Sequence, residues 1–320
     1  MVQISIVIPV YNEEESLPEL ALWISRVMSE HGYSYEIIFI NDGSTDQSWK
    51  VITELGKQNG HIKGIGFTRN YGKSAALDVG FNRAIGDVVI TMDADLQDSP
   101  EEIPGLYEMI LTEDYDIVSG WKKKRYDPIS KTIPSRFFNG VTSMISGIPL
   151  HDFNCGLKAY KIKVVKNINV YGEMHRYIPL IAKWNGFSKI GEKVVEHRSR
   201  KYGYTKFGME RFINGFLDLI SVSFVHRYKK KPMHFFGTLG TFSFLSGFII
   251  TMWLIAEKIY GLQQGIFVRE ITNQPLFFLA LVALIIGVQL FVTGFLAEMM
   301  TSSNARRTDY NIENEINFPS

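Results

Sequence analysis

The chain has 320 residues, and its 34 Lys and Arg residues balance 33 Asp and Glu residues to a formal net charge of +1. This balance excludes the strongly basic composition typical of nucleic-acid-binding proteins, so we expect no nucleic acid as a partner. The single cysteine, Cys155, excludes an internal disulfide and a cysteine-rich zinc site, and it fits a reducing compartment.

The first half of the chain alternates short β-branched segments with segments of helical periodicity. We expect strands over residues 4–10, 36–40, 62–68, 88–92 and 117–120, with helices over 16–30, 47–59, 74–84 and 100–111. This alternation predicts an α/β domain with a mostly parallel, Rossmann-like sheet. Ligands of such sheets bind beyond the carboxyl ends of the strands, so the loops after the strands form the candidate site. The first strand begins without a preceding charged region or cleavage site, so we expect no signal peptide.

Asp42 follows the second expected strand in the segment Asn41-Asp42-Gly43-Ser44. A carboxylate here can accept a hydrogen bond from a nucleotide base, and Gly43 allows a tight turn. The alternative is a simple turn followed by the cap of the next helix, and the two roles can coexist in different residues.

Two carboxylates, Asp93 and Asp95, follow the apolar strand 88–92, and Gln97 lies two residues further along. Paired carboxylates supply the oxygen ligands that Mg²⁺ or Mn²⁺ prefers, with waters and substrate phosphates completing the coordination. A solvated acidic turn has the same pattern. The position directly after a strand favours the metal site.

Two uncharged runs of 22 residues, 235–256 and 276–297, are each long enough to cross the roughly 30 Å hydrocarbon layer of a membrane. Two buried helices of a soluble protein are the alternative. Basic residues precede the first run and follow the second, so the positive-inside rule places both termini in the cytoplasm. Residues 207–228 carry apolar side chains at helical spacing, which indicates either a helix in the membrane interface or an amphipathic helix packed on the domain.

We therefore divide the chain into four parts. A catalytic domain covers 1–210, an amphipathic juxtamembrane segment covers 211–233, and two transmembrane helices with a short extracytoplasmic loop cover 234–300. Residues 301–320 form a cytoplasmic tail that we expect to be loosely ordered after Arg307. Small residues in the first span, Gly237, Gly240 and Gly247, could support a homo-oligomer.

Four segments carry a resemblance to a known family. They are VIPVYNEE at 7–14, NDGS at 41–44, DADLQDSPE at 93–101 and DFNCG at 152–156. Together, in this order, they resemble the family-two glycosyltransferases with the GT-A fold, over about residues 4–210. Within that family the chain most resembles the polyprenyl-phosphate glycosyltransferases, which include dolichol-phosphate mannose synthase and the bacterial bactoprenol glucosyltransferases. The two-span tail resembles the bacterial members.

The resemblance implies roles for the matching positions. The nucleotide sugar would be bound by Pro9, Tyr11, Glu13, Asp42, Asp93, Ala94, Lys122, Arg200 and Lys206. Arg200 and Lys206 would belong to a flexible basic loop that closes on the diphosphate. Lys122 and Lys158 stand where some members have Arg, and lysine loses the bidentate fork with which Arg holds phosphate.

The remaining roles concern the metal, the reaction and the acceptor. The metal ligands would be Asp93, Asp95 and Gln97, and the catalytic residues would be Asp152, Asp95 and Arg200. Asp152 would act either as a general base or as a residue that orients the acceptor. Candidates for binding the lipid phosphate are Arg125, Ser135 and Arg136.

The implied reaction is inverting transfer of a sugar from a nucleotide sugar to a polyprenyl phosphate, either undecaprenyl or dolichyl phosphate, at the cytoplasmic face of the inner membrane. UDP-glucose is the expected donor and GDP-mannose the alternative; the product would be a lipid-linked monosaccharide of the cell envelope. A processive polysaccharide synthase is a second enzymatic interpretation, but its Gln-x-x-Arg-Trp motif is absent from the sequence. A scaffold that binds nucleotide sugars without turnover is the non-enzymatic alternative, against which the intact Asp93 and Asp95 pair argues.

Overall fold

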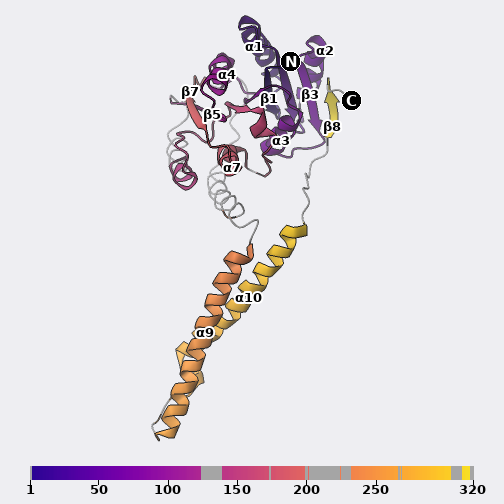
Figure 1. The fold of residues 1–320 in the computed structure, drawn as a ribbon. Helices are drawn as coiled ribbons and strands as arrows, with labels where there is room; N and C mark the ends of the chain where they lie inside the picture. The colour runs from indigo at the N-terminus through magenta and orange to yellow at the C-terminus, as the bar shows by residue number, and fades with distance from the viewer. Residues whose placement is uncertain are drawn as a thin grey trace. The chain divides into compact units, whose positions relative to one another are not determined.

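The computed structural model describes residues 2–123, 139–172, 174–198, 201, 224, 232–265, 267, 269–303 and 312–317 (Figure 1). The chain divides into two compact units. The first contains residues Met1–Leu219 and Asp309–Ser320, and the second contains Ile220–Thr308. The expected tail is therefore divided between the two units, while most of the expected amphipathic segment, 211–233, lies outside the described residues.

The described part of the first unit contains one eight-stranded sheet in the order β7-β5-β6-β4-β1-β2-β3-β8. The strands are β1 Ile4–Val10, β2 Tyr35–Asn41, β3 Ile62–Phe67, β4 Val88–Thr91, β5 Ile117–Trp121, β6 Lys158–Lys161, β7 Ile190–Val194 and β8 Ile312–Ile316. The central strands β4, β1, β2 and β3 are parallel, whereas β6 is antiparallel to both of its neighbours. The five strands predicted from the sequence are confirmed to within one residue at each end.

The helices between these strands also follow the predicted pattern. They are α1 Leu17–Glu30, α2 Ser48–Gln58, α3 Lys73–Arg83, the 3₁₀ turn η1 Pro100–Glu102 and α4 Ile103–Thr112. After β6 come the short α6 Ile162–Val165, η2 Met174–Tyr177 and α7 Ile178–Trp184. The periodicity of 3.6 residues fits α1, α2 and α4, each of which buries one stripe at helical spacing, whereas α3 is buried on most of its surface.

Helices cover both faces of the sheet, and β1 shows this most clearly. Alternate residues of β1, including Ile4 and Ile8, belong to the core that α1 and α4 complete. On the opposite face Val7 contacts Gly80 of α3. A central parallel strand covered on both faces is largely apolar, which explains the apolar sequence of β1 from Ile6 to Val10. Polar groups are therefore confined to the ends of such strands.

The C-terminal tail does not behave as expected. Residues Ile312–Ile316 form β8, which pairs antiparallel with β3, and Figure 1 shows this yellow strand at the edge of the sheet. The Asn317 side chain donates hydrogen bonds to the carbonyls of Gly56 and Ile62, at 3.1 and 2.8 Å. The expectation of a loosely ordered tail is wrong here, because a polar composition does not reveal that an open strand edge is available to pair with it.

The second unit contains two long helices, α9 Pro232–Gln263 and α10 Pro275–Ser303, which include the two predicted apolar runs. The 3₁₀ turn η3 Ile271–Asn273 lies between them. Only 17% and 11% of their most apolar 18-residue windows is buried. Helices of a soluble core would be mostly buried, so this exposure favours the membrane-spanning alternative.

Small residues bring α9 and α10 together. A Cβ added at Gly247 would lie 2.6 Å from the Ala280 carbonyl oxygen, and one added at Gly240 would lie 2.7 Å from that of Gly287. Close backbone approach at small residues is typical of packed membrane helices. Glycines that the sequence associated with a homo-oligomer are thus used for packing within one chain.

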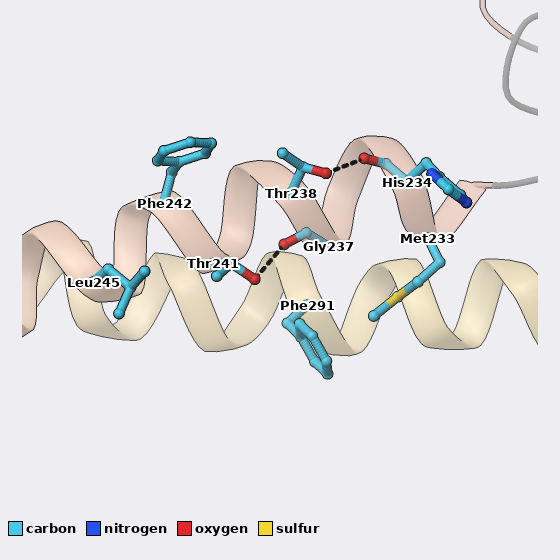
Figure 2. Close-up of a pocket in the computed structure, with 8 residues that line it drawn as sticks. All are labelled: Met233, His234, Gly237, Thr238, Thr241, Phe242, Leu245 and Phe291. Carbon is cyan, nitrogen blue, oxygen red and sulfur yellow. Dashed lines mark hydrogen bonds between the residues drawn. The ribbon is translucent and has the colours of Figure 1, made fainter.

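A pocket of about 430 Å³ lies along this helix pair and is lined by Met233, His234, Gly237, Thr238, Thr241, Phe242, Leu245 and Phe291 (Figure 2). The Thr238 hydroxyl donates to the His234 carbonyl at 2.5 Å, and the Thr241 hydroxyl donates to the Gly237 carbonyl at 2.7 Å. Because both hydroxyl donors bond to the helix itself, the pocket wall is largely apolar.

Candidate active site

The loops that follow β1 and β2 are joined by hydrogen bonds. The Asn12 N–H donates to Ser44 Oγ at 3.0 Å, and the Glu13 N–H donates to Ser48 Oγ at 2.9 Å. In the opposite direction, the Thr45 N–H donates to Asn12 Oδ1 at 2.8 Å. Asn12 has a φ of 55°, a left-handed conformation that Asn tolerates better than most residues. These bonds bring the two loops to one end of the sheet.

Three expected donor-binding residues come from β1 and its loop. Pro9 is the next-to-last residue of β1 and pairs with Ile40 of β2. Tyr11 begins the loop with 37% of its surface exposed, so its ring is accessible to a ligand. One oxygen of the Glu13 carboxylate lies 3.2 Å from Ser16 Oγ, which donates to it. The carboxylate is thus oriented by the start of α1.

Asp42 follows β2 and is buried, with 4% exposure. The N–H groups of Tyr71 and Gly72 donate to its two carboxylate oxygens at 2.6 and 2.9 Å. Burial raises the pKa of Asp42, and these two backbone hydrogen bonds oppose the rise. Asp42 therefore attaches the loop after β3 to the end of β2. Each oxygen has a second lone pair with which to accept a hydrogen bond from a base.

Gly43 allows the same two loops to touch. It has a φ of 64°, and a Cβ at this position would clash with the backbone of Arg69. Both observations require glycine, because other L-residues rarely adopt this φ and all of them carry a Cβ.

Asp93 follows β4, and Lys73, the first residue of α3, donates from Nζ to one of its carboxylate oxygens. A Cβ at Gly156 would lie 2.5 Å from the other oxygen, so this glycine leaves room for the Asp93 carboxylate. Burial acts to raise the pKa of Asp93, but the charges of Lys73 and Lys122 outweigh it and hold that pKa well below its usual range. Asp93 is consequently an anion at neutral pH.

Asp95 and Gln97 lie in the tight turn that follows. The Gln97 N–H donates to an Asp95 carboxylate oxygen at 3.2 Å, and the Gln97 side-chain amide lies 3.4 Å from the Arg198 carbonyl oxygen, to which it donates. Ala94, between the two acids, is buried. Among the described residues, no group of three or more His, Cys, Asp or Glu side chains is arranged to hold a metal ion. Asp93 and Asp95, which are two residues apart in this turn, supply carboxylate oxygens that suit a divalent cation whose other ligands come from a diphosphate and water.

Lys122, which the resemblance assigns to nucleotide-sugar binding, is paired with an acidic residue of its own chain. Its Nζ lies 2.7 Å from a carboxylate oxygen of Asp98, and the two side chains are 15% and 0% exposed. Burial acts to lower the pKa of Lys122, but the charge of Asp98 reverses this and raises it above its usual value. Because Lys122 also lowers the pKa of Asp93, this arrangement favours an electrostatic effect on Asp93 rather than direct phosphate contact.

The segment from 152 to 158 is stabilised by a buried lysine that bonds to its backbone. Lys158 Nζ donates to the carbonyls of Phe153, at 3.1 Å, and of Cys155, and burial lowers the pKa of Lys158. Lys158 therefore supports this turn, and the structure does not direct it towards a phosphate. Asp152 is 1% exposed, and one of its oxygens accepts from the Asn154 N–H at 3.0 Å. A buried carboxylate bound to its own turn fits an orienting role better than that of a general base.

Five expected site residues lie outside the described residues, namely Arg125, Ser135, Arg136, Arg200 and Lys206. The others converge from the ends of β1, β2, β4 and β5 and from the turn before β6.

Lys73 and His175 belong to this site but were not identified from the sequence. The Ser74 hydroxyl accepts from the His175 N–H at 3.0 Å and lies 3.2 Å from its Nδ1, and the charge of His175 lowers the pKa of Asp93. Lysine is electrostatically unfavourable in the first turn of a helix, which carries the positive end of the helix dipole. A lysine at the start of α3, directly after a strand-end loop, was thus a signal that an acidic partner was nearby.

Comparison with known proteins identifies the family. The family model "Glycosyl transferase family 2" matches residues 5–170, more than half of the chain. The chain is 34% identical to dodecaprenyl-phosphate galacturonate synthase from Rhizobium johnstonii, covering 95% of this chain and 89% of that protein. It is 35% identical to undecaprenyl-phosphate 4-deoxy-4-formamido-L-arabinose transferase from Pectobacterium atrosepticum, covering 92% and 87%.

Solved structures with the same fold include glucosyl-3-phosphoglycerate synthase from Mycobacterium tuberculosis. Its complex with uridine diphosphate has a TM-score of 0.55 and 19% identity, covering 70% of this chain and 80% of that chain. Its complex with Mn²⁺ and UDP-glucose has a TM-score of 0.54 and 18% identity, covering 71% and 79%. At 18–19% identity the similarity shows only a shared fold, and this is the GT-A fold that the sequence predicted. The match over the strand-end motifs and the near-complete overlap with curated relatives lead to one conclusion: the chain belongs to glycosyl transferase family 2.

Proposed function

We propose that this protein transfers a sugar from a nucleotide sugar to the phosphate of a membrane polyprenol. The observation that carries the proposal is the joining of two features in one chain. The first is the strand-end site around Asp42 and Asp93, and the second is the pair of long, exposed apolar helices. The names of both curated relatives specify a polyprenyl-phosphate acceptor.

In this proposal the nucleotide lies across the ends of β1, β2 and β4. Tyr11 and Asp42 bind its base and ribose, and Asp93 and Asp95 hold Mg²⁺ or Mn²⁺ against its diphosphate. The cation, when bound, supplies positive charge to the departing nucleoside diphosphate. Lys73, beside Asp93, adds a further positive charge at that point. Stabilisation of developing charge in this way is commonly the largest contribution to catalysis.

The acceptor requires little activation. The second pKa of a phosphate monoester is about 6, so at neutral pH most of the acceptor is already a dianionic nucleophile. A strong general base is unnecessary, which agrees with an Asp152 that is buried and bonded to its own turn. Asp152 instead supports the residues facing the sugar and the acceptor.

The membrane arrangement follows from chain connectivity. Residues 1–219, which precede the two helices, and 309–320, which follow them, both belong to the first unit, so two membrane crossings would leave both on the same side. We assign this side to the cytoplasm, because basic residues at 227–231 and 306–307 flank the spans there. Residues 264–274 would face the opposite side.

The donor is proposed as a UDP-sugar, because the proteins that share the fold include one crystallised with UDP and with UDP-glucose. UDP-glucose remains the first donor to test and GDP-mannose the second. UDP-galacturonic acid belongs in the same comparison, because one curated relative is named for galacturonate.

The test uses the purified full-length protein in detergent with undecaprenyl phosphate, Mn²⁺ and each radiolabelled donor in turn. Label from the accepted donor should enter the organic phase as a lipid-linked monosaccharide. Asp95→Ala should lower this transfer by about 10²–10³-fold, the usual effect of removing a group that stabilises developing charge. Asp114→Ala is the matched control, because Asp114 is exposed and pairs with Lys161 and Lys189 away from the site.

Three outcomes would contradict the proposal. A water-soluble polymer as product would indicate a processive synthase. Binding of UDP-sugar without turnover for any donor would indicate a scaffold. Unchanged transfer by Asp95→Ala in the presence of EDTA would exclude the proposed cation site.

A further inference from the structure

Three consecutive residues connect the two carboxylates that anchor the donor site. The N–H groups of Tyr71 and Gly72 hold Asp42, and the next residue, Lys73, holds Asp93. Gly72 has a φ of 94°, so the chain turns sharply between the two contacts. Whatever moves Lys73 therefore acts on a turn that is also attached to the base-binding side of the site.

Lys73 differs from the other lysines near Asp93 in its freedom to change partner. Lys122 is paired with Asp98 in the interior, and Lys158 is bonded to two backbone carbonyls. The Lys73 and Asp93 side chains are 31% and 34% exposed, so solvent reaches this pair. Within the described part of the chain, Asp93 is the only hydrogen-bond or ion-pair partner of Lys73.

An ammonium group and a divalent cation cannot both sit favourably on the same Asp93 carboxylate. Like charges that share a ligand a few ångströms apart repel strongly where water is partly excluded. A cation that binds Asp93 must therefore displace Lys73 or bind with lower affinity. A displaced ammonium needs a new anionic partner, and the diphosphate of a nucleotide supplies one at the same place.

We propose that Lys73 is the resident counter-cation of Asp93 and exchanges Asp93 for the donor diphosphate when the divalent cation binds. The inference rests on the proposed function, since it needs both a cation and a nucleotide at this site. It assigns Lys73 as a positioning residue that makes cation and nucleotide binding interdependent. In the absence of nucleotide, Lys73 competes with the cation for Asp93. When a nucleotide is present, Lys73 contributes to binding of its diphosphate.

The test is a set of Mn²⁺ titrations of the full-length protein in detergent, followed by electron paramagnetic resonance, with and without saturating UDP. In the wild type, UDP should strengthen Mn²⁺ binding. In Lys73→Met, Mn²⁺ should bind more tightly than in the wild type without UDP, by at least about fivefold, the lower end of usual coupling between linked sites. UDP should bind more weakly to this variant, and the strengthening of Mn²⁺ binding by UDP should shrink.

Two controls separate charge from structure. Lys73→Arg keeps the positive charge and should retain most of the coupling. Lys163→Met removes a lysine that lies 3.5 Å from Asp116, outside the site, and should leave both affinities unchanged. If Lys73→Met does not fold, Lys73→Gln also removes the charge and is measured in the same way. The rise in melting temperature caused by Mn²⁺ alone should be larger in the neutral variant than in the wild type.

The outcomes are distinguishable. Unchanged or weaker Mn²⁺ binding by a folded neutral variant without UDP would overturn the inference and leave the proposed function intact. Failure of the wild type to bind Mn²⁺ even with UDP would remove the cation site itself, and with it both the proposed metal dependence and this inference.

Discussion

The buried ion pair between Lys122 and Asp98 gives the sharpest prediction. Asp98→Asn keeps the size of the side chain but leaves the Lys122 ammonium buried without its nearest negative charge. No hydrogen bond from another described residue reaches either Asp98 carboxylate oxygen, so Lys122 is the main compensation for burying that charge. Removing one partner of a buried pair costs about 3–5 kcal/mol. We expect a loss of stability in this range.

The single cysteine provides the assay. Cys155 is buried, and Lys122 and Asp98 are both close enough to affect its pKa. A thiol reagent therefore reports how often this region opens. With about 1.4 kcal/mol per factor of ten, the expected loss corresponds to labelling that is about 140- to 3,700-fold faster. Because Asp98 also acts directly on the thiol pKa, the urea midpoint of unfolding is measured as well.

The control is the same chemical change at an exposed site. Asp114→Asn removes contacts with Lys161 and Lys189 that lie at the surface, where water and salt screen them. Its labelling rate and urea midpoint should match those of the wild type. Equal labelling rates and midpoints for Asp98→Asn and the wild type would refute the view that this pair is a buried, mutually dependent unit.

Three further predictions follow from close contacts and from burial. Gly43→Ala should weaken UDP binding, because an alanine in this left-handed conformation costs about 1 kcal/mol and its methyl group would clash with the backbone of Arg69. Gly140→Ala is the control, because a Cβ at Gly140 meets nothing within 4 Å, and it should leave UDP binding unchanged. Gly247→Leu should lower the melting temperature in detergent through overpacking of about 1–3 kcal/mol, whereas Ser246→Leu at the exposed neighbouring position should leave it unchanged. Burial raises the pKa of Cys155 to about 12, so the neutral thiol stabilises the fold fully below pH 9, and this contribution is lost as the pH rises towards 12. Cys155→Ala should therefore lose less stability than the wild type between pH 9 and 11, and equal losses would contradict the assignment.

Strand β8 changes how a soluble fragment should be designed. A chain that ends near Tyr228 would lack the two apolar helices but keep strands β1 to β7. It would also lack β8, exposing the edge of β3 and removing the contact of Ile316 with Gly56 and Gly64. A fragment that rejoins residues 309–320 to the first unit is therefore the better test of whether the spans serve only as an anchor.

Local patterns in the sequence were sufficient for much of the fold. The period-2 and period-3.6 patterns located the strands and helices up to Trp121, because each element buries its own apolar face. The same reasoning placed Asp42 and Asp93 at strand ends, where a parallel sheet gathers polar groups. Length and lack of charge identified the two long apolar helices.

Only the tertiary structure decided which polar residues meet. Lys73 and Asp93 are 20 residues apart, and Lys122 and Asp98 are separated by α4 and β5. Such pairs depend on the order of strands in the sheet, which no local pattern encodes. The same applies to β8, whose polar sequence forms a strand only because β3 leaves an edge open. Residue types and periodicity thus determined the elements and the ends at which chemistry occurs. Strand order and burial determined which lysine is free to meet a ligand and which is confined to the interior.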